Sequence, residues 1–385
     1  MTDLIETRAI LHDLISYPTV SSGSNMACIG YLADRLERAG ARVEVLSDET
    51  GAKANLWATI GPEGDGGLVL SGHSDVVPVA DQDWASDPFV MEERGGALFG
   101  RGTCDMKGFI AAAVAMAPVY AARELTRPIH FAFTHDEETG CLGGQALVAM
   151  LRERGIRPAM AIIGEPTDMR IIEGHKGCCE YSTHFTGLEG HGSGPDLGVN
   201  AVEYAVRYVS RLLELKEELR RRCPPGSPFV PPWTTINTGA LIGGVAHNVI
   251  PGKARIDWEM RPVQWSDADF VKADLEAFCT NTLLPAMQCV HPDARIYTEV
   301  IGEVVGLEPM SRNAIRDLVA ELTGANGSDV VPFGTEAGLF QQLGIDVVVC
   351  GPGSIAQAHK PDEFVTLAQL SQCLGMLDQL GARAG

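Results

Sequence analysis

The sequence has few basic residues for its size. Its 385 residues include 30 lysines and arginines against 50 aspartates and glutamates, which gives a formal net charge of −20. A surface that binds phosphates needs clustered lysine and arginine, so we expect neither a nucleic-acid partner nor docking on anionic lipid. The basic run near 213–222 follows acidic residues at helical spacing, which is typical of a solvated helix face.

Long apolar runs and C-x-x-C motifs are also missing. The Ala-rich run at 109–122 is too short to span a membrane and is typical of a buried helix. The first 16 residues predict a charged amphipathic helix without the basic flank and apolar centre of a signal peptide. Ten cysteines are scattered without a C-x-x-C pair, which indicates reduced interior thiols. We therefore expect a cytoplasmic protein with no membrane partner.

Three common motifs of catalysis and nucleotide binding are absent as well. The sequence has no G-x-S-x-G elbow, no G-x-x-x-x-G-K-[ST] phosphate loop, and no G-x-G-x-x-G after its first predicted strand. These absences argue against an α/β serine hydrolase, a P-loop nucleotide enzyme and a dinucleotide-binding enzyme.

The pattern of helices and strands indicates two domains, one inserted into the other. From residue 1 to 176 helices alternate with near-continuous apolar strands, which predicts an α/β fold with a mostly parallel sheet and helices on both faces. Residues 177–304 follow a β-α-β-β-α-β order, which predicts an inserted α+β domain with a four-stranded antiparallel sheet. The α/β character resumes over 305–385, the expected second part of the first domain.

Histidines and carboxylates follow several predicted strands of the first domain. In open α/β sheets the carboxyl ends of the strands form the crevice where ligands collect. Charged groups gathered there are costly without a cation. Two imidazoles and three carboxylates suit Zn²⁺, with Co²⁺ and Mn²⁺ as alternatives, so the pattern predicts a metal site. The residues at these positions are His73, Asp75, Asp105, Glu137, Glu138, Glu165 and His359.

Spacing suggests separate roles for some of these residues. Two divalent ions about 3.5–4 Å apart need a bridging anion, which we assign to Asp105. Asp75 lies on the same side of an extended segment as His73 and can accept its imidazole N–H. Glu137 and Glu138 are neighbours that point in different directions, so we expect one to ligate a metal and the other to act as a general base. The pattern does not say which.

The same residues can also be interpreted as purely structural, without a metal site. A single histidine such as His73 is often a satisfied core residue, and adjacent glutamates in a loop are usually solvated. His191, in the Gly-rich segment 187–198, is either a turn residue or a group aimed at the cleft. The repetition of ligands after apolar strands is what favours the metal site.

Taken together, these segments resemble the dinuclear zinc amidohydrolase and exopeptidase family, which includes acetylornithine deacetylases, succinyl-diaminopimelate desuccinylases, aminoacylases and glutamate-releasing carboxypeptidases. The motifs "SGHSDVVPV", "GRGTCDMKG", "HDEETG", "GEPT", "HNVIP", "EMRP", "FGTEAG" and "GPGSIAQAHKPDEF" occur in order over nearly the whole chain. The resemblance implies a general base at Glu137, an orienting role for Asp75, and a cis peptide between Asp105 and Met106. It also implies two divalent metal ions, with Asp105 as the bridge, held by His73, Asp105, Glu138, Glu165 and His359.

The resemblance further implies a partner subunit. The inserted domain would serve as a lid and dimerisation domain, so we expect a homodimer. His191 would reach the active site of the other subunit and polarise the scissile carbonyl. Asn248 and Arg261 would hold the carboxylate of the substrate, Arg261 through bidentate pairing.

The closest resemblance is to the acetylornithine deacetylase branch, which implies hydrolysis of N2-acetyl-L-ornithine to L-ornithine and acetate in arginine biosynthesis. If Glu336 faces the cleft, its charge would favour an ornithine-like cation. One departure is "EAG" at 336–338, where the branch more commonly has "EAP". The alternatives are another N-acyl amino acid, succinyl-diaminopimelate or a dipeptide as substrate, and, outside enzymes, a metal-binding protein that kept the fold without catalysis.

Overall fold

The computed structural model describes residues 2–385, with only the backbone of Thr2, and it divides into two compact units. The first unit comprises the described residues up to Gly174, Pro309–Val330 and Thr335–Gly385. The second unit comprises His175–Glu308 and the short stretch Val331–Gly334. No helix within residues 2–385 is long and apolar enough to cross a membrane.

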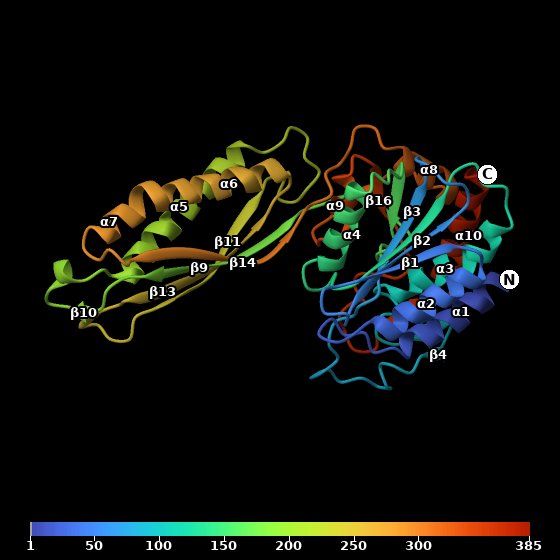
Figure 1. The fold of residues 1–385 in the computed structure, drawn as a ribbon, viewed down its shortest axis with the longest axis horizontal. Helices are drawn as coiled ribbons and strands as arrows, with labels where there is room; N and C mark the ends of the chain where they lie inside the picture. Colours follow the sequence, from blue (N-terminus) through green and yellow to red (C-terminus); the bar gives the residue numbers. More distant parts are fainter. Residues whose placement is uncertain (1) are drawn as a thin grey trace. The chain divides into compact units, whose positions relative to one another are not determined.

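A mixed eight-stranded sheet forms the centre of the first unit (Figure 1), in the order β1-β2-β6-β3-β7-β16-β8-β15. Its strands are β1 (Arg42–Ser47), β2 (Ala54–Ile60), β3 (Leu68–His73), β6 (Ile129–Thr134), β7 (Met160–Ile163), β8 (Ile172–His175), β15 (Asp329–Val331) and β16 (Asp346–Val349). The four central strands β6, β3, β7 and β16 run parallel, whereas β1, β2 and β8 pair antiparallel toward the edges. The predicted fold class, a mostly parallel sheet flanked by helices, is confirmed.

Helices cover both faces of this sheet. Helix α3 (Lys107–Ala121) packs on β3, with α1 (Thr2–Ile15), α2 (Met26–Arg38) and α10 (Leu367–Arg383) against it, and α8 (Ala314–Thr323) lies beside α10. On the other face α4 (Leu142–Glu153) contacts α9 (Ala337–Gln341) (Figure 1).

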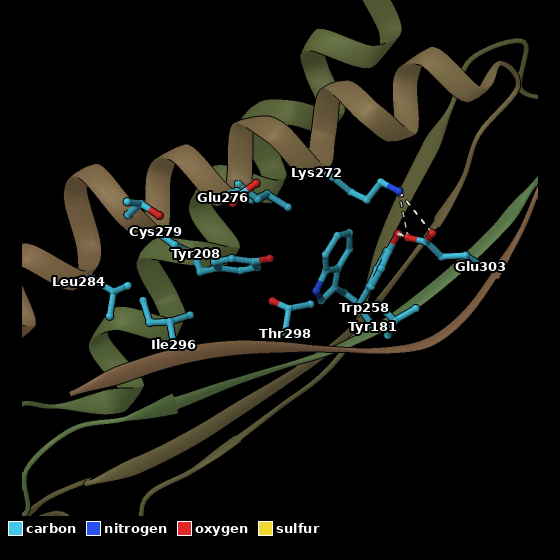
Figure 2. A pocket seen from close by; sticks show the side chains of 13 residues that line it. Tyr181, Tyr208, Trp258, Lys272, Glu276, Cys279, Leu284, Ile296, Thr298 and Glu303 are labelled. Atoms are coloured by element: carbon cyan, nitrogen blue, oxygen red, sulfur yellow. Dashed lines mark hydrogen bonds and ion pairs between the residues drawn. The ribbon is translucent and has the colours of Figure 1, made fainter. Parts of the chain in front are cut away.

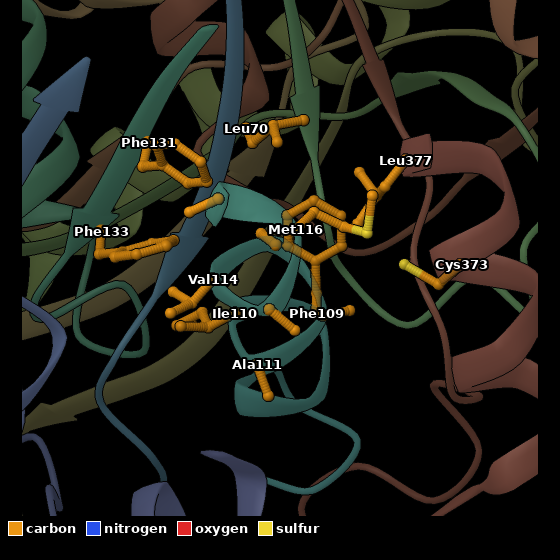
Figure 3. Packing of buried hydrophobic residues seen from close by; sticks show 14 of the residues in the cluster. Leu70, Phe109, Ile110, Ala111, Val114, Met116, Phe131, Phe133, Cys373 and Leu377 are labelled. Atoms are coloured by element: carbon orange, nitrogen blue, oxygen red, sulfur yellow. The ribbon is translucent and has the colours of Figure 1, made fainter. Parts of the chain in front are cut away.

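Helix α3 is apolar on almost every side because it lies between two layers. Figure 3 shows its side chains between the strands and helix α10. The contacting side chains include Leu70, Phe109, Ile110, Val114, Met116, Phe131, Phe133, Cys373 and Leu377. The end of β7 comes so close to this helix that a Cβ on Gly164 would lie 1.9 Å from Cγ of Phe109. Only glycine fits there, and the next residue is Glu165.

A three-stranded sheet that the sequence did not predict ties two distant segments of the first unit together. Strand β5 (Ala97–Phe99) pairs with β4 (Glu92–Arg94) on one side and with β17 (Phe364–Thr366) on the other. The chain just before helix α3 is thereby fixed beside the chain just before helix α10.

The second unit has a four-stranded antiparallel sheet in the order β11-β13-β9-β14, as the residue pattern predicted. The strands are β9 (Cys178–Thr186), β11 (Thr235–Gly243), β13 (Lys253–Arg261) and β14 (Arg295–Val304). Helices α5 (Ala201–Arg221) and α6 (Trp265–Phe278) pack with this sheet, and Asn200 caps α5 by accepting two backbone N–H bonds. At the end of the unit where Thr186 pairs with Lys253, β10 (Gly190–His191) pairs with β12 (Val249–Ile250).

A hollow of about 330 Å³ lies between α6 and this sheet (Figure 2). Its walls include the rings of Tyr181, Tyr208 and Trp258. At one end Nζ of Lys272 lies 3.1 Å from Oε1 of Glu303, which also accepts a 2.5 Å bond from the hydroxyl of Tyr181. These three polar groups therefore satisfy one another within the unit.

Candidate metal centre and active site

The ends of the four central strands bring the candidate ligands of the first unit together. Because β6, β3, β7 and β16 are adjacent and parallel, their carboxyl ends lie along one edge of the sheet. His73 ends β3, the two glutamates at 137 and 138 follow β6, and Glu165 follows β7. His359 lies in the loop after β16, and Asp105 precedes α3.

Asp105 stands between the two histidines. Its Oδ1 lies 3.0 Å from Nε2 of His73, and its Oδ2 lies 3.3 Å from Nε2 of His359. One carboxylate that offers a different oxygen to each side has the arrangement a bridging ligand needs. The peptide between Asp105 and Met106 is cis, as the resemblance implied.

The remaining two candidate ligands each face one histidine. Both carboxylate oxygens of Glu138 lie 3.1 Å from Nε2 of His359. Oε1 of Glu165 lies 3.7 Å from Nε2 of His73, and this buried oxygen has no hydrogen-bond partner. The structure thus places all five candidate ligands in one cluster.

The cluster fits divalent metal ions. Ligand atoms of His73, Glu137 and Glu165 lie within 4.8 Å of one another, and so do those of His73, Asp105 and Glu138. A buried carboxylate oxygen without a partner is costly, and a cation would relieve that cost. The donor set contains only nitrogen and oxygen atoms, which suits zinc, cobalt or manganese.

The electrostatics of the cluster point the same way. Burial raises the pKa of Glu165 well above its usual value, and Asp105 and Glu137 raise it further, although His73 opposes the shift. Burial also raises the pKa of Glu137 to about 8. Hydrogen bonds with Asp105 and Glu138 raise the pKa of His359 to about 10. The raised pKa values of these carboxylates and imidazoles indicate an excess of negative charge in the cluster. Bound cations would neutralise that charge.

Asp75 supports both sides of the cluster. Its main-chain oxygen lies 2.9 Å and its Oδ1 3.5 Å from Nδ1 of His73. The same carboxylate accepts the backbone N–H of Glu137 at 3.2 Å and of Glu138 at 3.4 Å. Ser21 donates a 2.6 Å bond to its Oδ2. Nothing in the sequence around Ser21 signals this contact.

The two glutamates have different surroundings. Glu138 faces His359, whereas the carboxylate of Glu137 receives a hydrogen bond only from Sγ of Cys141, at 3.5 Å, among those described for residues 2–385. The third acid of the run, Asp136, is paired with Nζ of Lys53 at 2.6 Å. Among residues 2–385, the carboxylate of Glu137 therefore has the weakest described hydrogen bond of the three acids in the run.

Glu336 lies differently from the expectation that it faces the cleft. It is 1% exposed, and its carboxylate points at the sheet, where Oε1 accepts a 2.5 Å bond from Ser71 and Oε2 a 2.8 Å bond from Thr134. Because both oxygens are engaged by strands β3 and β6, the carboxylate is not free to meet a substrate cation. We therefore do not retain Glu336 as a selector of substrate.

The three candidate residues of the second unit fall into two places. His191 is exposed, with Nδ1 2.7 Å from Oγ of Ser193, and it lies beside Asn248, whose carbonyl accepts the N–H of Gly192 at 2.8 Å. Arg261 lies at the other end of β13, where its guanidinium donates to Glu259 at 2.8 Å. Within a single chain, Arg261 therefore lies apart from His191 and Asn248.

Comparison with known proteins identifies the family. The model of peptidase family M20/M25/M40 matches residues 69–382. The chain belongs to this family. It is 35% identical over 379 residues to the acetylornithine deacetylase of Proteus mirabilis, a match that covers 96% of this chain and 95% of that protein.

Solved structures of the M20 family share the fold. A metallo-carboxypeptidase from Sulfolobus solfataricus superposes with a TM-score of 0.71 at 16% identity, covering 98% of both chains. A Bacillus subtilis protein described as a dinuclear metal binding peptidase superposes with a TM-score of 0.64 at 15% identity, covering 99% of this chain and 98% of that chain. Family membership and the cluster of histidines and carboxylates together make this chain a metal-dependent hydrolase.

Proposed function

We propose that this enzyme hydrolyses the amide bond of an N-acyl amino acid, with N2-acetyl-L-ornithine as its substrate, in arginine biosynthesis. The observation that carries the proposal is the cluster of five candidate ligands with a sixth carboxylate, that of Glu137, beside it, in a chain 35% identical to an acetylornithine deacetylase. Another N-acyl amino acid, succinyl-diaminopimelate or a dipeptide would use the same chemistry, so these remain the competing substrates.

In this proposal the first unit supplies the hydrolytic centre. Two divalent ions, zinc first among them, would be held by His73, Asp105, Glu138, Glu165 and His359, with Asp105 shared. Such ions, when bound, polarise an amide carbonyl and lower the pKa of water.

Glu137 handles the proton of the reaction. It accepts a proton from the attacking water as the new C–O bond forms, and it returns that proton to the amine as the C–N bond breaks. Asp75 keeps His73 and the backbone of Glu137 in place through the contacts described above.

The second unit supplies the substrate contacts, and these come from two subunits. His191 and Asn248 lie near the start of β13, whereas Arg261 ends it. A nine-residue strand spans about 27 Å at ~3.4 Å per residue, far more than the length of an acyl amino acid. If all three residues serve one substrate, they must belong to different chains. We therefore propose a homodimer in which His191 and Asn248 act on the site of the partner and Arg261 on its own.

The test is hydrolysis by zinc- or cobalt-loaded protein of N2-acetyl-L-ornithine, N-acetyl-L-methionine and N-succinyl-diaminopimelate, with a chelated control. A higher kcat/KM on acetylornithine that chelation abolishes is the expected result. Activity on only one of the other substrates would keep the reaction class and reject the substrate. Absence of activity on all three with two metals bound would reject N2-acetyl-L-ornithine as the substrate and favour either a substrate outside these three or a metal-binding protein without catalysis.

A further inference from the structure

A second buried carboxylate lies behind Asp105, in a place the hydrolytic reaction does not use. Oε1 of Glu363 accepts three backbone N–H bonds, from Gly102 at 3.0 Å, Cys104 at 2.9 Å and Asp105 at 3.0 Å. Its Oε2 accepts a 2.6 Å bond from Nη1 of Arg101. Glu363 and Arg101 are each 1% exposed. One side chain thus fixes the backbone of the turn that presents Asp105.

Arg101 extends the same contacts toward the second histidine. Its Nη2 donates a 2.6 Å bond to Oε1 of Gln82, and its Nη1 lies 3.3 Å from the carbonyl of Lys360. Nε2 of Gln82 in turn donates a 2.9 Å bond to the carbonyl of His359. The guanidinium also lies 5.1 Å from the ring centroid of Trp84. We call Gln82, Arg101 and Glu363 the brace.

The brace joins segments that only the fold brings together. Glu363 immediately precedes strand β17, and Arg101 follows strand β5, so the pairing of β5 with β17 places the two residues side by side. The turn that carries Asp105 and the loop that carries His359 are thereby tied to one another through side chains that are not candidate ligands.

Stability alone is a poor explanation for this ion pair. Removing a carboxylate and a guanidinium from water carries a large desolvation cost, and apolar residues of similar volume often stabilise a fold as well or better. What an apolar pair cannot do is hold three backbone N–H groups and two loops in one geometry.

We propose that Arg101 and Glu363 are positioning residues that set the spacing between Asp105 and His359, and so the affinity of the site for its metal ions. This inference rests on the proposed metal centre. Oδ2 of Asp105 and Nε2 of His359 are 3.3 Å apart, and a shift of either loop would change that separation directly. Neither Arg101 nor Glu363 is a candidate ligand or the proposed base.

The test compares two full-length variants that each lose one carboxylate of a buried or partly buried ion pair. Glu363→Gln keeps the shape of the side chain but leaves Arg101 without a charged partner. Glu173→Gln is the matched control, because Glu173 accepts a 2.8 Å bond from Arg316 and a 2.6 Å bond from Ser328 in the same unit, away from both loops. Zinc affinity and stoichiometry are measured by competition with a chromogenic chelator, beside kcat and KM on acetylornithine and urea unfolding.

We expect Glu363→Gln to weaken zinc binding at one site or both by about 10- to 100-fold, the usual effect of removing a partner that orients metal ligands. Its kcat should fall with zinc affinity and recover in part with excess zinc, while KM changes little. Glu173→Gln should lose stability but keep the zinc affinity of the unaltered protein.

Wild-type zinc affinity in Glu363→Gln would overturn the inference and leave the proposed hydrolase intact. Failure of the unaltered protein to bind zinc would overturn both. If Glu363→Gln does not fold, Gln82→Ala decides, because Gln82 is only half-buried and its loss removes the bond to the His359 loop and one bond of Arg101 while the Arg101–Glu363 pair stays in place. A smaller loss of zinc affinity in Gln82→Ala supports the inference, and unchanged affinity overturns it.

Discussion

The adjacent glutamates 137 and 138 offer a sharp test of the proposed chemistry, since they differ by one position and are assigned opposite roles. Both oxygens of Glu138 lie 3.1 Å from Nε2 of His359, whereas one hydrogen bond to the carboxylate of Glu137 is described within residues 2–385, from Sγ of Cys141 at 3.5 Å. Glu137→Gln should therefore remove a proton acceptor without removing a ligand. Glu138→Gln should do the reverse.

The expected magnitudes differ in kind for the two variants. A general base contributes about 10²- to 10⁴-fold to a rate, which is roughly 3 to 5.5 kcal/mol of activation free energy. We expect Glu137→Gln to lose kcat by that factor while it binds zinc as the unaltered protein does. We expect Glu138→Gln to bind zinc more weakly and to regain part of its kcat when zinc is in excess.

The assay pairs equilibrium dialysis, with zinc determined by mass spectrometry, with steady-state hydrolysis of N2-acetyl-L-ornithine over a range of free zinc. Each variant is the control for the other, because both change one carboxylate of the same turn to an amide. Loss of zinc together with kcat in Glu137→Gln, reversed by excess metal, would show that the two roles are exchanged.

Three further outcomes are expected. His191→Ala mixed with Glu137→Ala should recover about a quarter of wild-type activity after subunit exchange, because half the dimers are mixed and each has one intact site; no recovery would refute action across the dimer. Burial lowers the pKa of His130 to about 4. Below about pH 6.5 this histidine is therefore protonated in the unfolded chain but not in the folded unit, so the folded unit loses stability as the pH falls. Between pH 7 and pH 5, the unfolding free energy measured in urea should fall by about 2 kcal/mol less in His130→Gln than in the wild type. An equal fall in both proteins would contradict the pKa shift. Gly164→Ala should destabilise the first unit by about 3 kcal/mol in urea, because its Cβ would overlap Phe109. The control Gly375→Ala, whose Cβ would meet no atom of another segment within 4 Å, should not destabilise it. Equal effects of the two variants would contradict the packing described.

The residue pattern could place the candidate ligands at one edge of the sheet because that placement depends on a local rule. An apolar strand followed by a histidine or a carboxylate is visible in the sequence, and adjacent parallel strands necessarily end at one edge. His73, Glu165 and His359 therefore lie where the pattern predicted. The choice of Glu137 as base came from the resemblance, since neighbouring glutamates look alike in a sequence.

The expectations that failed, and the residues that were missed, depend on contacts between distant segments. Glu336 precedes a short helix in a loop, and its burial against Ser71 and Thr134 follows from strands about 200 residues or more away. Strands β4, β5 and β17 have three residues each, too few for a period to be visible. Arg101 and Glu363 stand inside recognisable motifs, yet nothing in either motif says that the two side chains pair.

The order of strands in the central sheet has a consequence during synthesis on the ribosome. Strand β7 lies between β3, which precedes it, and β16, which leaves the ribosome roughly 180 residues later. At about 5–20 residues per second, the intervening chain takes roughly 10–40 s to make. Throughout that interval the nascent sheet presents β7 as an open parallel edge, the kind of edge that recruits strands from other chains. The enzyme is thus most exposed to aggregation until roughly the last tenth of the chain is translated, so slow translation or absent chaperones should lower its yield even when the finished fold is stable.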